Sequence, residues 1–286
     1  MLLIFPPKSI KQRLDSFKLD DYADMRQKRE KILEWQNAIK NRNVKQSKEE
    51  SLQSDFLNHF FGDVLGYIYS RGADEYNLEK EEKATTDSTK ADGALGYFSL
   101  GSHDTRAVIE LKDASTDLDK PQNRKNDKRS PVEQAFSYAS KSGGKCKWVI
   151  VSNFIEIRLY HSSDQSKYEV FNIPDLLKLD ELKRFLFLLH KDRLICRTGE
   201  SEIEKLFAQR LAHEKSTEDG FYKEFKKIRW ELFQHLQNHN PNFEEQILFE
   251  KAQKLLDRFI FVFFCEDLSP PLLPSDTTRK ILDAYR

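Results

Sequence analysis

The chain has 286 residues, and its 47 lysine or arginine residues are balanced by 47 aspartate or glutamate residues, so the formal net charge is zero. A neutral chain has no overall basic field, and any surface that binds DNA must therefore come from a local separation of charge. Aromatic residues make up 12% of the chain, which favours a packed interior and excludes a disordered protein.

Cysteine spacing and the apolar segments indicate the cellular location of the protein. Cys146, Cys196 and Cys265 are far apart and form neither a disulfide framework nor a paired zinc-ligand spacing, so we expect a cytoplasmic protein. The opening segment "MLLIFPPKSIKQRL" has no basic region before its apolar run and is a poor signal peptide. The run "FIFVFF" at 259–264 is far shorter than the roughly 20 residues of a membrane span, and it predicts a buried helix face and no membrane partner.

Two helical segments come first in the chain. Residues 20–42 contain helix formers, with an acidic start and a basic end that suit the helix dipole. In the next segment, Ser47 and Glu50 have the spacing of a capping box at a helix start. Apolar residues then recur every four positions and predict one helix face toward a core: Leu52, Phe56, Phe60 and Val64.

Strand patterns follow these helices. Three short strands are predicted at 76–81, 91–98 and 106–112, with turn residues between them. Gly93 and Gly96 interrupt the middle strand, where they indicate a bulge or the close approach of another backbone.

A helix and further strands complete this part of the chain. The segment "SPVE" at 130–133 has the spacing of a capping box with proline at the first helical position, and the predicted helix ends at Gly143. The segment "KWVIVSNFIEIRLYH" at 147–161 predicts a buried strand, a tight turn and a second strand, and residues 168–173 predict an edge strand.

The strand patterns end near residue 174, and four segments with helical spacing follow at 175–192, 201–215, 220–239 and 242–267. We therefore expect an N-terminal helical extension over 1–45, an α/β domain with a mixed sheet flanked by helices over 46–175, and an all-α helical connector domain over 176–286. The last residues, "ILDAYR", form no closing element, which favours a longer polypeptide.

The third predicted strand ends in Glu110-Leu111-Lys112. Residues two apart in a strand share a face, so Glu110 and Lys112 point the same way. If the second and third strands form a hairpin, Asp92 lies close to both side chains. Grouping two carboxylates and an ammonium at a sheet end would be costly if it served stability alone. Spacing alone leaves open the alternative of a surface hairpin with a cross-strand ion pair.

These residue types suit metal-assisted hydrolysis. Asp92 and Glu110 are hard oxygen ligands of the kind that Mg²⁺ binds, with Mn²⁺ as an alternative metal, and the carbonyl of Leu111 is a candidate further ligand. A metal held there would activate a water for in-line attack and neutralise charge at a phosphate. Lys112 is the candidate group that positions the attacking water or stabilises developing charge.

The order of a capped helix, three strands, a helix and another apolar strand, with the segments "KADGALGYF", "AVIELKDA" and "SPVEQAFSYA", resembles the PD-(D/E)xK nuclease superfamily. More narrowly, it resembles the amino-terminal endonuclease region of type IIG restriction-modification enzymes, in which one polypeptide carries cleavage, a helical connector and adenine methylation. The resemblance implies a PD-(D/E)xK nuclease-like core over 46–175. It also implies that Asp92 and Glu110 are metal ligands, that Lys112 is the catalytic lysine and that Gln134 helps to orient the site.

Some positions bear on how far the resemblance extends. Glu50 matches the acidic residue that some members carry on the first helix, although its capping-box role is an equal alternative. Ala91 stands where the name of the motif has proline. The chain contains neither an Asn/Asp-Pro-Pro-Tyr/Phe motif nor a glycine-rich cofactor loop. S-adenosylmethionine would therefore belong to a missing methyltransferase part, covalently linked with a target-recognition domain.

The segment between the third strand and the next helix is polar and carries both signs of charge. Its basic residues are candidates for contacts with DNA phosphates, although a solvated loop is an equal alternative. These candidates are Lys120, Arg124, Lys125, Lys128 and Arg129.

Together these features predict a Mg²⁺-dependent endonuclease that hydrolyses phosphodiester bonds in double-stranded DNA, as the cleavage part of a type IIG enzyme. A transient homodimer would allow both strands to be cut. One alternative is a non-catalytic DNA-binding or scaffolding module with a nuclease fold. Another is the nuclease part of a type I restriction or repair system.

Overall fold

The computed structural model describes residues 3–41, 43–46, 49–70, 74–83, 90–122, 127–268, 270–274 and 276–285. The chain forms two compact units, Met1–Arg210 and Leu211–Arg286. Each unit contains its own cluster of buried apolar residues. Within the described residues, every helix is too short or too polar to pass through a membrane.

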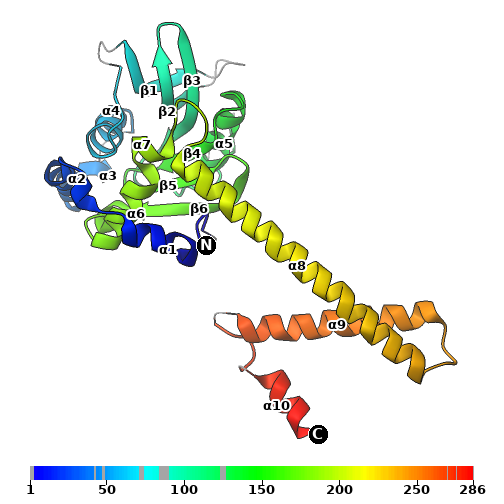
Figure 1. Cartoon of the computed structure of the whole chain (residues 1–286). Coiled ribbons are helices and arrows are strands. Elements are labelled where there is room, and N and C mark those ends of the chain that lie inside the picture. The colour runs from blue at the N-terminus through cyan, green and yellow to red at the C-terminus, as the bar shows by residue number, and fades with distance from the viewer. Residues whose placement is uncertain are drawn as a thin grey trace. The chain divides into compact units, whose positions relative to one another are not determined.

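The first unit is built around a mixed sheet, which has six strands in the described residues and the order β1-β2-β3-β4-β5-β6 (Figure 1). β3 and β4 run parallel, and the other neighbouring strands run antiparallel. The predicted mixed sheet is therefore confirmed. The strands are β1 (Glu75–Lys83), β2 (Lys90–Ser99), β3 (Ser102–Leu111), β4 (Trp148–Ser152), β5 (Glu156–His161) and β6 (Asp164–Asn172).

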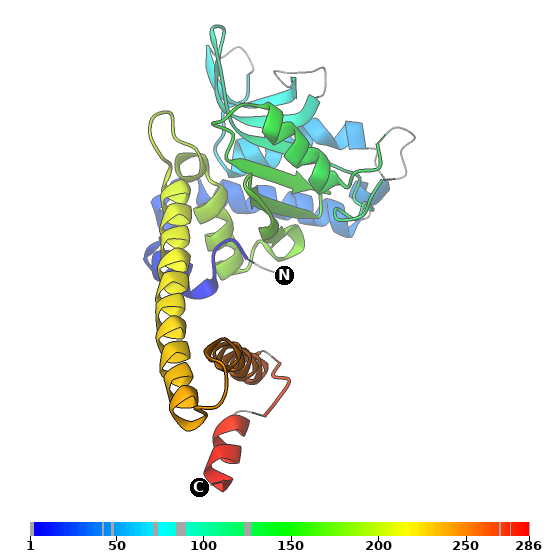
Figure 2. The same ribbon diagram turned by 90° about the vertical axis from the view of Figure 1, so that its right-hand side faces the viewer.

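Helices cover both faces of this sheet (Figure 2). Side chains alternate along a strand, so Ile109 packs into the larger core while its neighbour Val108 packs into the core formed with α5 (Pro131–Lys141). The larger core also takes apolar residues from α2 (Met25–Lys40), α4 (Glu49–Phe56), the π-helix η2 (Leu57–Val64) and α6 (Leu179–Leu189). Shorter elements are α1 (Pro7–Ser16), η1 (Leu19–Asp21), α3 (Asn43–Gln46), η3 (Ile173–Asp175) and α7 (Lys191–Leu194).

The predicted order of a helix, three strands, a helix and a further strand is confirmed. The capping box of α5 is present: Glu133 N–H donates to the Ser130 hydroxyl at 3.2 Å, and Ser130 N–H donates to the Glu133 carboxylate at 2.7 Å. Gly143 follows this helix with a φ of 97°, which favours glycine. Ser47, the predicted start of the earlier capping box, lies outside the described residues.

β2 and β3 form the predicted hairpin, and Ser99 pairs with Ser102 next to the turn. The register changes by one residue beside Gly96, where Arg106 is an extra residue of β3, so the predicted bulge is confirmed. A Cβ atom at Gly96 would lie only 2.2 Å from the carbonyl oxygen of Asp104. The close backbone approach explains why glycine occupies this position.

The first unit continues beyond the predicted boundary near residue 175. Leu182, Phe185 and Leu186 of α6 are fully buried in the larger core, so this helix belongs to the same body as the sheet. The division into domains over 1–45, 46–175 and 176–286 stays a prediction. The two compact units of the structure divide after Arg210.

α8 (Glu202–His239) is one continuous helix through Gly220, where the sequence predicted two separate segments. A single glycine destabilises a helix by only about 1 kcal/mol, so strong helix formers on both sides are enough to keep the helix continuous at this residue. The second unit contains α8 from Leu211 onward, together with α9 (Glu245–Asp267) and α10 (Thr277–Ala284). Its buried cluster consists of Phe233, Leu248 and Ala252.

The prediction that the apolar run 259–264 forms a buried helix face is wrong for the structure described. Phe261 is 65% exposed and Phe264 is 58% exposed. The reason is that the buried cluster of this unit uses residues from the first part of α9, while the apolar run lies further along the helix.

Candidate active site

β2 and β3 bring Asp92 and Glu110 to adjacent positions at one end of the sheet. Gly93 pairs with Ile109 in the antiparallel ladder, and Asp92 and Glu110 are the next positions along the two strands. Glu110 also lies in the parallel ladder between β3 and β4. Three strands therefore fix the backbone around this carboxylate.

Lys112 lies close to both carboxylates. Its Nζ atom contacts Glu110 Oε1, lies 3.1 Å from the Leu111 carbonyl oxygen and lies 4.0 Å from Asp92 Oδ2. The backbone N–H of Lys112 donates to the Ser152 carbonyl at 2.9 Å, which extends the pairing of β3 with β4. Glu110 and Lys112 are each only 3% exposed. Desolvation of a buried ion pair offsets much of its attraction, so stability alone does not explain this arrangement.

Asp92 is held by hydrogen bonds to both of its carboxylate oxygens. The backbone N–H of Leu111 donates to Oδ2 at 2.7 Å. The side chain of Gln53 on α4 donates from Nε2 to Oδ1 at 3.1 Å. The carboxylate therefore has a fixed orientation between α4 and β3.

Glu110 has an unusual electrostatic environment. Burial, followed by the charge of Asp92, raises the pKa of Glu110 to about 8, although Lys112 acts in the opposite direction. Its Oε2 atom is buried and has no hydrogen-bond partner among the described residues. Buried polar atoms normally have partners, so this atom indicates a place where a cation or a polar ligand would be stabilised.

The donor atoms at this position suit a hard divalent cation. In the part of the chain that the structure describes, no three His, Cys, Asp or Glu side chains lie close enough together to hold a metal. A metal would therefore depend on Asp92, Glu110 and the carbonyl of Leu111. This set fits Mg²⁺, which commonly takes one or two carboxylates and keeps several waters, and the unpartnered Glu110 Oε2 supports the fit.

Gln134 is buried on α5 and bonds to the loop before that helix. Its Nε2 donates to Asp127 at 3.1 Å, and its Oε1 accepts from Gln122 at 3.4 Å. One turn further along α5, burial and then the two site carboxylates raise the pKa of Tyr138 to about 12. The structure thus brings Asp92, Glu110 and Lys112 together, while the hydrogen bonds of Gln134 join it to the loop.

Glu49 and Gln53 of α4 also lie at the site, although the sequence reasoning missed them. Glu49 lines a cavity of about 320 Å³ together with Lys112, and its charge contributes to raising the pKa of Glu110. Glu50, the acidic residue expected from the family resemblance, is exposed. The spacing of four between Glu49 and Gln53 places both on one helix face, and this spacing was the available signal.

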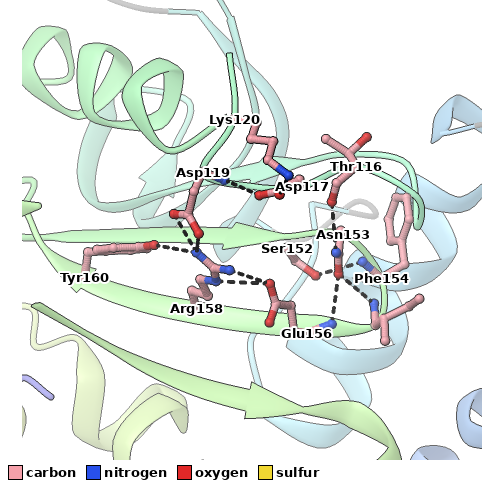
Figure 3. A network of polar contacts seen from close by, with 11 residues as sticks. Thr116, Asp117, Asp119, Lys120, Ser152, Asn153, Phe154, Glu156, Arg158 and Tyr160 are labelled. Atoms are coloured by element: carbon pink, nitrogen blue, oxygen red, sulfur yellow. Dashed lines mark hydrogen bonds and ion pairs between the residues drawn. The ribbon is translucent and has the colours of Figure 1, made fainter. Parts of the chain in front are cut away.

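The loop after β3 supplies most of the remaining lining of this cavity. Among the predicted DNA contacts, Lys120 lies on this lining, and its side chain is 78% exposed. Lys120 pairs with Asp117 at 2.8 Å (Figure 3). The loop residues on the lining are Asp113, Thr116, Asp117, Lys120, Pro121 and Gln122.

The other predicted DNA contacts lie further along the same loop. Lys128 is exposed, and Arg129 pairs with Asp127 at 2.7 Å. Arg124 and Lys125 lie outside the described residues.

Comparisons with known proteins add a family match. The family model described as "MmeI, N-terminal domain" matches residues 25–214, a range that includes the sheet and the whole candidate site. No curated protein matches the chain. A solved structure titled "cryoEM structure DrdV-DNA complex" matches with 17% identity and a TM-score of 0.35, covering 57% of this chain and 98% of that chain.

Proposed function

Because this chain belongs to the MmeI N-terminal domain family of type IIG restriction-modification enzymes, we propose that it is a Mg²⁺-dependent endonuclease that hydrolyses phosphodiester bonds in DNA. A restriction-system role follows from the family, and the proposal assigns the cleavage step to this chain. The observation that carries it is the buried Glu110–Lys112 pair beside Asp92 at the end of the sheet. We assign the core to the PD-(D/E)xK nuclease fold on the same grounds.

In this proposal Asp92 and Glu110 hold the metal, with the carbonyl of Leu111 as a further ligand. When bound, Mg²⁺ would supply positive charge that activates a water and neutralises charge at the phosphate, and Mn²⁺ is the expected substitute. The hydrogen bonds from Leu111 and Gln53 keep the Asp92 carboxylate in one orientation. Fixed orientation of a ligand is what such outer contacts provide in metal sites generally.

Lys112 acts on the reacting groups directly. Its ammonium has three donors and lies beside both carboxylates, so it can orient the attacking water while it remains bonded to Glu110. It can equally donate to the phosphate oxygen on which charge develops. Gln134 contributes indirectly in this scheme, because it holds the loop residue Gln122 on the cavity lining.

Double-stranded DNA is the proposed substrate, with Lys120, Lys128 and Arg129 as candidate phosphate contacts. Cleavage of both strands would require a second copy of the site, for which a transient homodimer is the proposed source. A linked methyltransferase, with its S-adenosylmethionine, and a target-recognition domain would supply methylation and sequence choice.

Supercoiled-plasmid nicking by the purified chain in Mg²⁺, Mn²⁺ or EDTA tests the proposal. Asp92→Ala and Lys112→Ala should each lower the nicking rate by about a hundredfold or more, as expected for loss of a catalytic group. The matched controls are Asp175→Ala and Lys178→Ala, because these two residues form an exposed ion pair at 2.6 Å on the surface. Both controls should nick at the wild-type rate.

Nicking that persists in EDTA, or that survives Asp92→Ala, would refute the assignment. No nicking by the wild-type chain, together with no metal binding by calorimetry, would instead support the non-catalytic module. No nicking with metal binding that Asp92→Ala abolishes would indicate that the site needs the other parts of the enzyme for activity.

A further inference from the structure

The loop that follows Lys112, residues 113–122, is fixed to the sheet by side chains from β5 and from the turn before it (Figure 3). Arg158 Nη1 on β5 donates to both carboxylate oxygens of Asp119, each at 2.9 Å. Asn153 Nδ2 donates to the carbonyl of Thr116 at 3.2 Å. Between these two points Leu118 is only 1% exposed, in the core formed with α5.

Arg158 is itself held firmly and is only 8% exposed. Its Nη2 atom pairs with Glu156 at 2.8 Å, and its guanidinium group lies 4.8 Å from the centre of the Tyr168 ring. The planar guanidinium fork is preorganised, so it loses little freedom when it pairs with a carboxylate. Because Arg158 is fixed on β5, its bonds hold Asp119 in a fixed position relative to the sheet.

Asn153 has a similarly fixed side chain. Its Oδ1 atom accepts from the backbone N–H groups of Ile155 and Glu156 at 3.2 Å and 3.0 Å. These bonds orient the amide so that its Nδ2 atom faces Thr116. Thr116 and Asp119, in the middle of the loop, are thus tied to the same β-hairpin.

The fixed loop determines what lies beside Lys112. Of the described residues that line the cavity, Lys112 and Lys120 are the cationic ones. The Lys120 ammonium is exposed and pairs with Asp117, which is 45% exposed. Exposed ion pairs of this kind contribute little stability, so an arriving phosphate can take the place of Asp117 at small cost.

We propose that Arg158 and Asp119 are positioning residues whose ion pair preforms residues 113–122 as a phosphate-binding loop. In this arrangement Lys120 binds a backbone phosphate of DNA next to the Lys112 site. Because the loop is already ordered, DNA binding does not have to supply the free energy of ordering it. The inference rests on the proposed function, since that function makes DNA the ligand.

The test is a mutant cycle between Lys120 and Asp119, measured as equilibrium binding of a short DNA duplex in EDTA at several salt concentrations. Lys120→Ala should weaken binding about five- to tenfold and lower the salt slope by about one phosphate contact. Asp119→Ala should weaken binding by a similar factor. In the Asp119→Ala background, Lys120→Ala should then have less than about a twofold further effect, because the loop no longer presents the lysine.

Two further variants test the role of the Arg158–Asp119 pair and provide a control. Arg158→Lys retains the positive charge, but its single ammonium cannot replace the Nη1 bonds to Asp119 and the Nη2 and Nε bonds to Glu156 at the same time, so it should reproduce the effect of Asp119→Ala. Asp175→Ala, which removes an exposed carboxylate that pairs with Lys178, should bind like the wild type. The Asp119 side chain is 60% exposed, so its variant is expected to fold, which thermal unfolding checks.

Equal effects of Lys120→Ala in both backgrounds would overturn the inference, and so would failure of the wild-type chain to bind the duplex. Plasmid nicking by the same proteins separates the two proposals. Coupled binding without wild-type nicking and without metal binding would refute hydrolysis and leave the loop inference standing. Nicking without coupling would refute the loop inference alone.

Discussion

Replacement of Gly96 by alanine should strongly destabilise the protein. The added Cβ would lie 2.2 Å from the Asp104 carbonyl oxygen and 2.9 Å from the Phe98 ring. The closer of these atoms belongs to the backbone of the neighbouring strand, so the hairpin itself has to move. Forcing an extra carbon into a packed position costs about 1–3 kcal/mol, and we expect the upper end here.

The same glycine bears on the candidate site, because it lies at the bulge. On the Gly93 side of the bulge, the register makes Asp92 and Glu110 the next positions along the two strands. Continuing the register from the other side of the bulge, where Tyr97 pairs with Asp104, would bring Ile109 to that position instead of Glu110. A one-residue slip turns every side chain to the other face of a strand, so Gly96→Ala should also reduce nicking.

The assay is urea denaturation, followed by plasmid nicking under conditions where the variant is folded. Gly101→Ala is the matched control, because a Cβ at Gly101 in the same hairpin would meet no heavy atom within 4 Å. This control should stay within about 0.5 kcal/mol of the wild type, as surface substitutions generally do. Equal stability of Gly96→Ala and Gly101→Ala would refute the reasoning.

Three other predictions concern α5, a buried histidine and the support of Asp92. Ser130→Ala removes the capping box of α5 and should lower the free energy of unfolding by about 1 kcal/mol; an unchanged urea midpoint would contradict this. Burial lowers the pKa of His190 to about 4, so at acidic pH the unfolded chain binds a proton that the folded chain does not. The free energy of unfolding should therefore fall by up to about 3 kcal/mol as the pH is lowered from about 6.5 to about 4. A His190→Gln variant with an unchanged pH profile would refute this. Gln53→Met removes one hydrogen bond to Asp92 and should slow nicking about tenfold with little change in thermal unfolding, and a wild-type rate would rule out its orienting role.

Features with local causes could be predicted from the sequence. The capping box at Ser130 depends on residues three positions apart, and the hairpin depends on a short turn between two alternating segments. The grouping of Asp92, Glu110 and Lys112 follows from the strand period of two combined with that hairpin. These residues could therefore be placed together before the structure was known.

Features that depend on distant packing could not be predicted. Gln53 reaches Asp92 across 39 positions of sequence only because α4 lies beside the end of β2, and Arg158 reaches Asp119 across the same separation. The long α8 continues through Gly220, although a glycine after a polar segment is typical of a helix end. The apolar run at 259–264 is typical of a core, yet an apolar run does not show whether another element covers it.

The mixed sheet also implies an order of events during folding. β2 and β3 are joined by a short turn, whereas the parallel pairing of β3 with β4 closes a longer loop that contains α5. Closing a longer loop costs more entropy, so we expect this pairing to form later. Asp92 and Glu110 should therefore meet before Lys112 gains its backbone bond to Ser152. Pulsed hydrogen exchange should show hairpin amides protected before those of β4, and the reverse order would contradict this. A chain emerging from the ribosome would thus acquire its complete candidate site only after β4 has been synthesised.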